Sequence, residues 1–141
     1  MSQVRRSKNT TQRAYDRMSH VYDWLAGSSE TRLILQGIEL LAVNSGESIL
    51  EIGCGTGRAL VEFCSRSASQ AQVFGLDLSR GMLRVAGSRV MKGNLGENIH
   101  LLEGNGRSLP IGRGRFSAIF ISFTLELFDT PEIRQVLAEC H

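Results

Sequence analysis

Short hydrophobic runs alternate along this chain with stretches that can form helices. The hydrophobic runs are residues 48–53, 72–77, 98–103 and 116–122. Their length and composition favour β-strands. The stretches that suit helices between and after them are residues 57–67, 79–92 and 130–140. Strands that alternate with crossover helices form parallel, right-handed β-α-β units. The pattern therefore predicts an α/β fold with a ligand site at the carboxyl end of the first strand.

Two further helical patterns precede the first strand. One covers about Thr11 to Ala26, with Met18, Val21, Tyr22 and Leu25 on one face, and ends near Gly27. The other runs from Glu30 to Val43. We therefore expect a single domain over residues 1–141, in which residues 1–45 supply amino-terminal helices and residues 46–141 form the α/β core.

The first strand runs into a glycine-rich turn. Glu51 is followed by Gly53, Gly55 and Gly57, and glycine allows positive φ and close approach of a ligand to the backbone. The dinucleotide fingerprint G-x-G-x-x-G would need its third glycine at position 58, which is Arg58. A phosphate-binding P-loop would need a Lys-Ser or Lys-Thr pair, and none follows these glycines. The turn therefore indicates a nucleotide-like cofactor that is neither NAD nor ATP.

Residues 49–57 read Ile-Leu-Glu-Ile-Gly-Cys-Gly-Thr-Gly. This stretch resembles the first motif of the class I S-adenosylmethionine-dependent methyltransferases. The resemblance implies S-adenosylmethionine as cofactor and S-adenosylhomocysteine as product. It also implies a cofactor-binding role for the acid, the glycines and the residues between them. These are Glu51, Gly53, Cys54, Gly55, Thr56 and Gly57.

The second hydrophobic run ends in a carboxylate, Asp77, which follows Gly57 by 20 positions. In open α/β sheets an acid at this place accepts hydrogen bonds from a ribose diol. Such charge-assisted bonds are each worth roughly 1.5–3 kcal/mol when shielded from water. Ser79 is placed to cap the next helix. The segment is similar to the second motif of the same family, which implies that Leu78 and Met82 pack on the adenine.

The third and fourth hydrophobic runs end in segments that are also similar to family motifs. Gly104, Asn105 and Gly106 stand where the family has Gly-Asp-Ala, whose acid accepts from the adenine amino group. Asn105 can still accept but carries no charge, so we expect adenine binding weaker by about 1 kcal/mol. Ser122 and Phe123 lie at the mouth of the fourth strand, where the cofactor would sit. Ser117 departs from the Phe-Asp that usually opens this strand.

Residues 14–23 resemble a segment of the ubiquinone and menaquinone biosynthesis methyltransferases and of their relatives that act on phospholipid amines. Residues 123–129 also suit that subgroup. The resemblance implies an amino-terminal helix folded over the cofactor. Tyr22 is then either a hydroxyl that reaches the methionine part or the substrate, or a core aromatic on an amphipathic helix.

The resemblance implies a Rossmann-like three-layer sandwich with a mostly parallel sheet in the strand order 3-2-1-4. Family members continue past the equivalent of His141 into strands 5 to 7, which this chain lacks. Because the fourth strand pairs with the fifth in the family, we expect residues 116–122 to form an exposed apolar edge. Such an edge favours a homodimer or a higher assembly.

Composition narrows the remaining classes of function. The net charge of +2, from 16 basic and 14 acidic residues, gives no electrostatic case for nucleic acid or an anionic membrane. No leader-like or membrane-spanning apolar run is seen, so we expect a cytoplasmic protein without stable membrane insertion. Three cysteines at wide spacing and three scattered histidines form no pattern for a metal, and we expect none.

Two functional hypotheses follow. The first is a methyltransferase (EC 2.1.1.-) that acts on a small quinone-precursor-like or lipid-like acceptor, with no catalytic residue identifiable from sequence. Methyl transfer from a sulfonium depends mainly on positioning and needs a general base only when the acceptor loses a proton. Glu126 is the best-placed carboxylate for that role, although a helix-start or surface position suits it better. The alternative is a non-catalytic cofactor-binding fragment or interaction module that is completed by oligomerisation.

Overall fold

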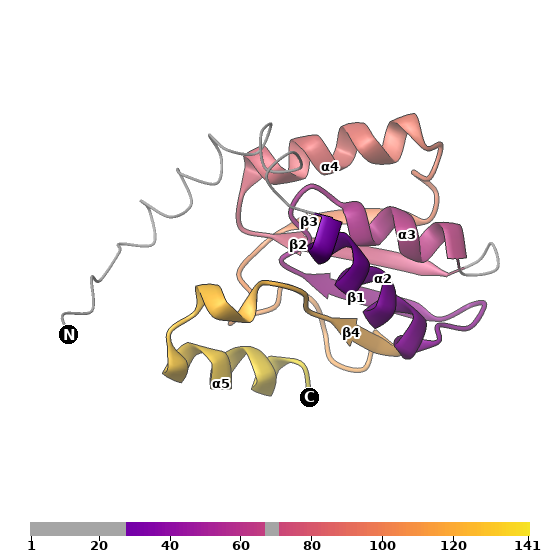
Figure 1. Cartoon of the computed structure of the whole chain (residues 1–141). Coiled ribbons are helices and arrows are strands. Elements are labelled where there is room, and N and C mark those ends of the chain that lie inside the picture. Colours follow the sequence, from indigo (N-terminus) through magenta and orange to yellow (C-terminus); the bar gives the residue numbers. More distant parts are fainter. Residues whose placement is uncertain (1–27, 67–70) are drawn as a thin grey trace.

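A four-stranded parallel sheet forms the middle of the molecule (Figure 1). The structure is a computed structural model that describes residues 28–66 and 71–141. Its strands are β1 (Ser48–Ile52), β2 (Gln72–Asp77), β3 (Ile99–Glu103) and β4 (Ala118–Phe120). They are ordered β3-β2-β1-β4, and all neighbouring pairs are parallel. The predicted α/β class and strand order are therefore confirmed.

Four helices connect or follow the strands. They are α2 (Ser28–Leu41), α3 (Arg58–Arg66), α4 (Arg80–Lys92) and α5 (Thr130–Glu139). A 3₁₀ turn, η1 (Leu125–Leu127), precedes α5. These helices agree with the predicted ones to within a few residues. The helix expected over residues 11–26 lies outside the described residues.

The fourth strand is shorter than the predicted residues 116–122. The Ser117 amide donates to the Ser48 carbonyl at 2.8 Å, but the ladder with β1 covers only Ala118 to Phe120. Beyond it the chain turns at Phe123, whose φ is +50°. A left-handed residue cannot continue a strand, because extended backbone needs a strongly negative φ.

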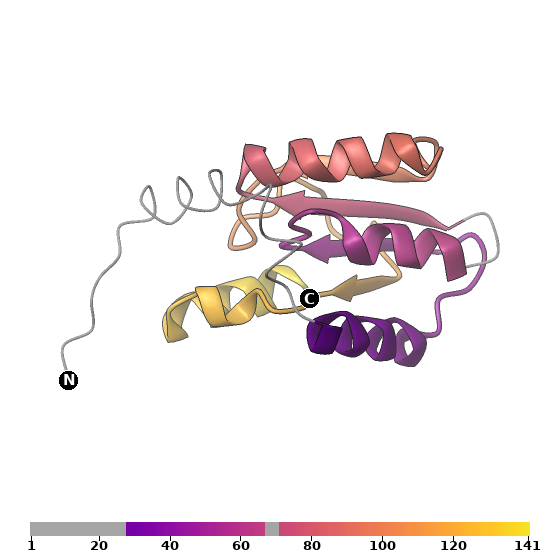
Figure 2. The same cartoon turned by 45° about the horizontal axis from the view of Figure 1, so that its top comes forward.

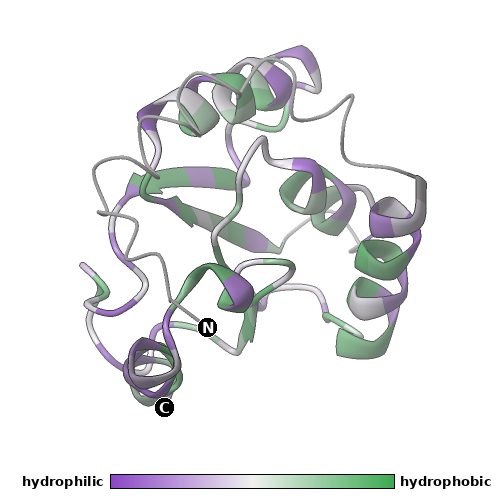
Figure 3. Cartoon of the chain, turned by 60° about the vertical axis from the view of Figure 1, so that its left-hand side comes forward, coloured by the Kyte–Doolittle hydropathy of each residue, from purple (hydrophilic) through white to green (hydrophobic). Residues whose placement is uncertain are grey.

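Alternating strand residues place hydrophobic side chains on both faces of the sheet. Ile49 and Val73 pack with Phe63 and Ile38 on the face covered by α2, α3 and α4. The opposite face carries a second core under α5. It is centred on Leu50, Ile52, Leu76 and Val136. Figures 1 and 2 show this three-layer arrangement, and Figure 3 shows the mainly hydrophobic strands between helices of mixed character. Strands covered on both faces need such near-continuous apolar runs.

The predicted helix signals appear as capping contacts. The Ser79 hydroxyl accepts from the Met82 amide at 3.2 Å and caps α4, as predicted. Pro131 lies in the first turn of α5, where the lack of an amide proton costs nothing. The Glu132 carboxylate accepts from the Asp129 amide at 3.3 Å. These contacts fix where both helices start.

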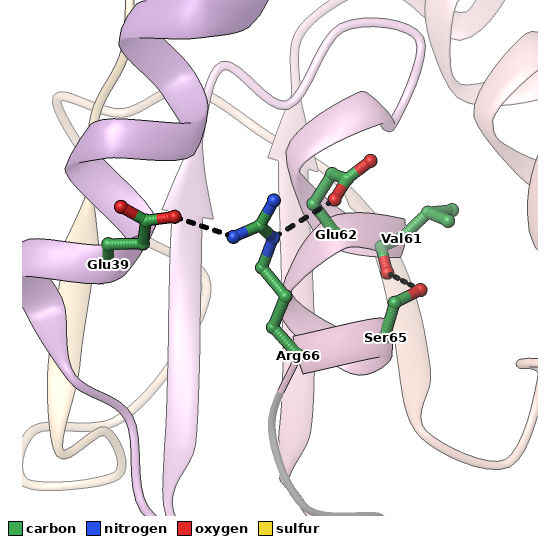
Figure 4. Close-up of polar contacts among 5 residues, drawn as sticks. All are labelled: Glu39, Val61, Glu62, Ser65 and Arg66. Carbon is green, nitrogen blue, oxygen red and sulfur yellow. Dashed lines mark hydrogen bonds and ion pairs between the residues drawn. The ribbon is translucent and has the colours of Figure 1, made fainter.

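A surface ion pair links α2 with α3 (Figure 4). The Arg66 guanidinium donates to Glu39 on α2 at 2.9 Å and to Glu62 on its own helix at 3.2 Å. The hydrogen bond that Arg66 donates to Glu62 is the main reason that the pKa of Arg66 rises above its usual value. All three side chains are solvent-exposed. The pair therefore orients the helices more than it stabilises them.

Close packing of α3 on the sheet depends on Gly75 in the centre of β2. A Cβ atom there would lie 2.5 Å from Leu60 Cδ1 and 2.9 Å from Cys54 Sγ. Leu60 is fully buried, so it has little room to move. A strand glycine often marks such a close approach.

We expect Gly75→Ala to lower the free energy of unfolding by about 1–3 kcal/mol through overpacking. Gly96→Ala is the matched control, because a Cβ at Gly96 meets nothing within 4 Å. Urea denaturation followed by circular dichroism measures both. Equal stability of the two variants would contradict the close packing of β2 against α3.

Candidate functional site

The carboxyl ends of the strands and the segment after β4 surround one pocket. The strand arrowheads in Figure 1 mark this edge of the sheet. The predicted binding residues that line it are Glu51, Gly53, Cys54, Gly55, Thr56, Asp77, Leu78, Met82, Gly104, Asn105, Gly106, Ser122 and Phe123. Gly57 belongs to the same turn but does not line the pocket, and Tyr22 lies outside the described residues. The site stands where parallel α/β sheets bind ligands, next to the first strand.

The turn after β1 has the backbone that its glycines predict. Gly53, Gly55 and Gly57 have φ values of +75°, +53° and +79°. The Gly53 and Cys54 amides donate to the Leu76 carbonyl at 2.7 and 3.1 Å, which ties the turn to β2. A Cβ at Gly55 would meet nothing within 4 Å. Because Gly55 lines the pocket, the missing side chain leaves room for a ligand against the backbone.

Glycine is needed at position 57 for close packing, since Gly57 does not line the pocket. A Cβ at Gly57 would lie 2.9 Å from the Ala86 Cβ on α4. The glycine therefore lets the start of α3 approach α4. Its positive φ also turns the chain into α3.

Asp77 is held rigidly at the end of β2. Its Oδ2 accepts from the Gly55 amide and its Oδ1 from the Ser79 amide, both at 2.8 Å. Each carboxylate oxygen has two lone pairs and can accept more than one hydrogen bond. The carboxylate thus links the glycine turn to the start of α4 and still faces the pocket.

Glu51 is a buried acid in the wall of the pocket. The residue is 2% exposed, and its Oε2 has no hydrogen-bond partner. Burial, and secondly the negative charge of Asp77, raise the pKa of Glu51 well above its usual value. A buried carboxylate oxygen without a donor is costly. A cationic or hydrogen-bond-donating group in the pocket would remove that cost.

The loop after β3 forms another wall. The Asn105 Oδ1 accepts from the Arg107 amide at 3.0 Å, and the Asn105 carbonyl accepts from the Ser108 amide at 2.9 Å. A Cβ at Gly106 would lie 2.8 Å from Ile52 Cγ2. Glycine in place of the alanine of the family motif is therefore required by close packing on β1.

Comparison with known proteins identifies the family. Residues 49–141 match a family model described as a methyltransferase domain. The chain belongs to this methyltransferase family. S-adenosylmethionine is the cofactor of such enzymes, and the buried acid and glycine cradle described above fit a ligand of that kind.

Two curated relatives are demethylmenaquinone methyltransferases. That of Porphyromonas gingivalis is 29% identical over 119 residues, which are 84% of this chain and 47% of the relative. That of Listeria welshimeri is 29% identical over 128 residues, which are 91% of this chain and 52% of the relative. The chain spans about half the length of these curated relatives.

A solved structure shares the fold. The S-adenosylmethionine-dependent methyltransferase of Aquifex aeolicus superposes with a TM-score of 0.69 at 22% identity, covering 86% of this chain and 66% of that protein. At this identity the likeness concerns the fold alone. It agrees with the Rossmann-like arrangement of the methyltransferase domain.

Several residues of the methyltransferase pocket were not predicted. Arg58 lines it and donates from Nη1 to the Thr31 hydroxyl at 2.9 Å, which ties α3 to α2. Arg107 lines it too and pairs with Glu132 of α5 at 2.6 Å. Arg58 directly follows the glycines, so its position could have suggested a role. Glu132 could not be placed from sequence, because its nearness to the pocket depends on how α5 packs.

The carboxylates that line the methyltransferase pocket are Glu30, Glu51, Asp77 and Glu132. Glu126, the candidate base named from sequence, is exposed on η1 and does not line it. The surface interpretation of Glu126 therefore agrees with the structure.

The thiol of Cys54 is buried, and burial raises its pKa well above the usual value. Such a thiol stays protonated at neutral pH, as expected of a packing residue. Within residues 28–66 and 71–141, no group of three or more His, Cys, Asp or Glu side chains is placed to hold a metal ion. In the same described part of the chain, no helix is long and apolar enough to cross a membrane.

The raised pKa of Glu51 makes the stability of the ligand-free protein depend on pH. Between its usual pKa of 4.5 and its folded value, the folded protein binds more protons than the unfolded chain. The stabilising contribution of protonated Glu51 is therefore complete below pH 4.5 and lost as the pH rises through the folded pKa. We expect Glu51→Gln to be more stable than the unchanged protein at pH 8 by about 1–3 kcal/mol. The difference should shrink as the pH falls towards 5.

Thermal unfolding of both proteins from pH 5 to pH 8 measures this effect. Glu97→Gln, at an exposed position, is the control and should follow the unchanged protein. A Glu51→Gln variant that is less stable at every pH would show that the carboxylate has a stabilising partner.

Proposed function

We propose that this chain binds S-adenosylmethionine in the pocket and takes part in methyl transfer to a small-molecule acceptor. The observation that carries the proposal is Asp77. Two backbone amides hold its carboxylate at the carboxyl end of β2, facing a glycine turn that is open to a ligand. This is the arrangement that an adenosine ribose requires, since a diol can donate two hydrogen bonds to one fixed carboxylate.

The adenine would lie on the β2 and β3 side of the ribose. Met82 is buried and Leu78 half-exposed, and both line the pocket there. Together they offer apolar surface to the two-ring base. Asn105 can accept from the adenine amino group through its remaining lone pair, since one already receives the Arg107 amide.

The methionine part would lie over the glycine turn, on the β1 and β4 side. Gly55 leaves room for it, and Cys54 and Thr56 supply the backbone on either side. The unpartnered Oε2 of Glu51 could then accept from the ammonium group of the ligand. Ser122 and Phe123 would border the same end.

Bound S-adenosylmethionine supplies an electrophilic methyl group on its sulfonium. The protein then has to hold the acceptor in line with the sulfur–methyl bond. The pocket adds apolar walls from Ile34, Leu127 and Phe128. These walls, and the named substrate of the curated relatives, favour a quinone-precursor-like or lipid-like acceptor. We do not propose nucleic acid as a substrate or partner. We propose that the protein is cytoplasmic.

Calorimetric titration with S-adenosylhomocysteine tests the cofactor site. We expect the unchanged chain to bind, and Asp77→Ala to weaken binding ten-fold or more through loss of the charge-assisted bonds to the ribose. Asp77→Asn should have an intermediate effect, because it keeps one oxygen acceptor. Glu97→Gln is the control, and melting curves check that each variant is folded. Equal affinity of Asp77→Ala and the unchanged chain would place the ribose elsewhere.

A second candidate function, a cofactor-binding module completed by oligomerisation, is favoured by the free side of β4. Within the described residues β4 pairs only with β1, so one side of its backbone has no strand partner. Phe120 of β4 packs beneath Gly37 of α2. On that helix Leu33 and Leu40 are 56% and 87% exposed. An unpaired strand beside exposed leucines is a surface that favours self-association.

Light scattering after size exclusion tests this assembly. At tens of micromolar we expect a mass of at least twice the 15.5 kDa of one chain. The double substitution Leu33→Lys and Leu40→Lys should restore the monomer by placing charges in the contact. Leu137→Lys, at an exposed leucine of α5 on the other face of the sheet, is the control. A monomeric mass of the unchanged chain would contradict the proposal.

A further inference from the structure

Phe123 has a backbone conformation that its side chain does not favour. Its φ is +50°, in the left-handed region that bulky residues seldom adopt. Among the described residues it belongs to neither hydrophobic core, yet it lines the pocket. Core packing therefore gives no reason for the conformation. Such residues persist only when neighbouring contacts fix them, and they occur often at functional sites.

Thr124 supplies those contacts. Its side chain is buried, and its hydroxyl donates to the Ser122 carbonyl at 2.8 Å, across Phe123. The Gly53 carbonyl lies 3.4 Å from the same oxygen. The hydroxyl thus closes a tight turn around Phe123.

The same threonine rests directly on the glycine turn. A Cβ on Gly53 would lie 2.3 Å from Thr124 Oγ1 and 2.4 Å from its Cγ2. Thr124 therefore occupies the space that any other residue at position 53 would fill. The segment after β4 and the turn after β1 meet in one fixed corner formed by Gly53, Ser122, Phe123 and Thr124.

The position of this corner decides which part of a ligand it can affect. The corner lies where β1 and β4 end, and β4 is at the opposite edge of the sheet from β3. In the proposed binding mode adenosine lies towards β2 and β3. The corner then borders the homocysteine end, where the methyl group leaves.

We propose that Thr124 is a positioning residue that holds Phe123 in its left-handed conformation against the homocysteine end of the cofactor. The inference rests on the proposed cofactor site. It assigns the shape of the methyl-donating end of the pocket to the Thr124 hydroxyl. The adenosine end is shaped separately, by Asp77 and the loop after β3.

Calorimetry with two probes, S-adenosylhomocysteine and adenosine, separates the two ends of the pocket. Thr124→Val keeps the size of the side chain and removes the hydroxyl. It should weaken S-adenosylhomocysteine binding about 3- to 10-fold, the loss expected for one hydrogen bond. Adenosine affinity should change less than about two-fold. Thr124→Ser retains the hydroxyl and should restore S-adenosylhomocysteine binding.

Substitutions of Phe123 test the left-handed conformation without any ligand. Glycine adopts positive φ freely, so Phe123→Gly should melt at a higher temperature than Phe123→Ala, the reverse of the usual order. In the Phe123→Gly background Thr124→Val should have no further effect on S-adenosylhomocysteine binding, because no ring remains to be held.

The outcomes distinguish this inference from the proposed function. If the unchanged chain binds neither probe, the proposed cofactor site is wrong and the inference falls with it. If both probes bind and Thr124→Val weakens them equally, or not at all, only the inference is overturned. A Phe123→Gly variant that melts below Phe123→Ala would also overturn it.

Discussion

The hydrogen bonds to the carboxylate of Asp77 are the contacts on which the site depends. One amide comes from the turn after β1 and the other from the start of α4, so a single side chain joins two loops that the sheet brings together. Without an acceptor here, the Gly55 amide would have to turn towards the ligand or remain unpaired. The carboxylate therefore shapes the turn before any ligand arrives, and pre-organisation of this kind lowers the cost of binding.

The same geometry places two acids close together. Glu51 lies one strand away from Asp77, is buried, and has an oxygen without a donor. Negative charge from Asp77 adds to the cost of burying Glu51. A folded protein tolerates such a cost where function requires it. A ligand with a cationic amine at one end and a diol at the other would satisfy both acids, which explains why this wall is acidic while most of the pocket is apolar.

The hydrophobic pattern predicted the fold, and the glycine turn together with the resemblance to the family motifs predicted most of the residues that line the pocket. Strand runs, the glycine turn and the acid at the end of β2 follow from spacing alone. The sequence could not show which glycines of the turn line the pocket and which permit close packing. A Cβ at Gly55 would meet nothing within 4 Å, whereas a Cβ at Gly57 would lie against Ala86. The sequence pattern also missed Glu132 and Thr124, whose roles come from contacts between distant segments. The length of β4 was overestimated because the hydrophobic run of residues 116–122 does not show that pairing with β1 is limited to Ala118 to Phe120.

The walls of the pocket are each anchored by a different contact. Thr124 rests on Gly53, Arg107 pairs with Glu132, and Arg58 donates to Thr31. None of these three contacts involves Asp77, so a change in one wall leaves the two amide hydrogen bonds to its carboxylate in place. Such independence suits a family that keeps one cofactor and varies its acceptors, since substitutions near the acceptor then leave cofactor binding intact. In the proposed binding mode the walls nearest the methyl-donating end come from α2, η1 and the corner at Thr124. Acceptor specificity should therefore reside in these segments and not in the glycine turn.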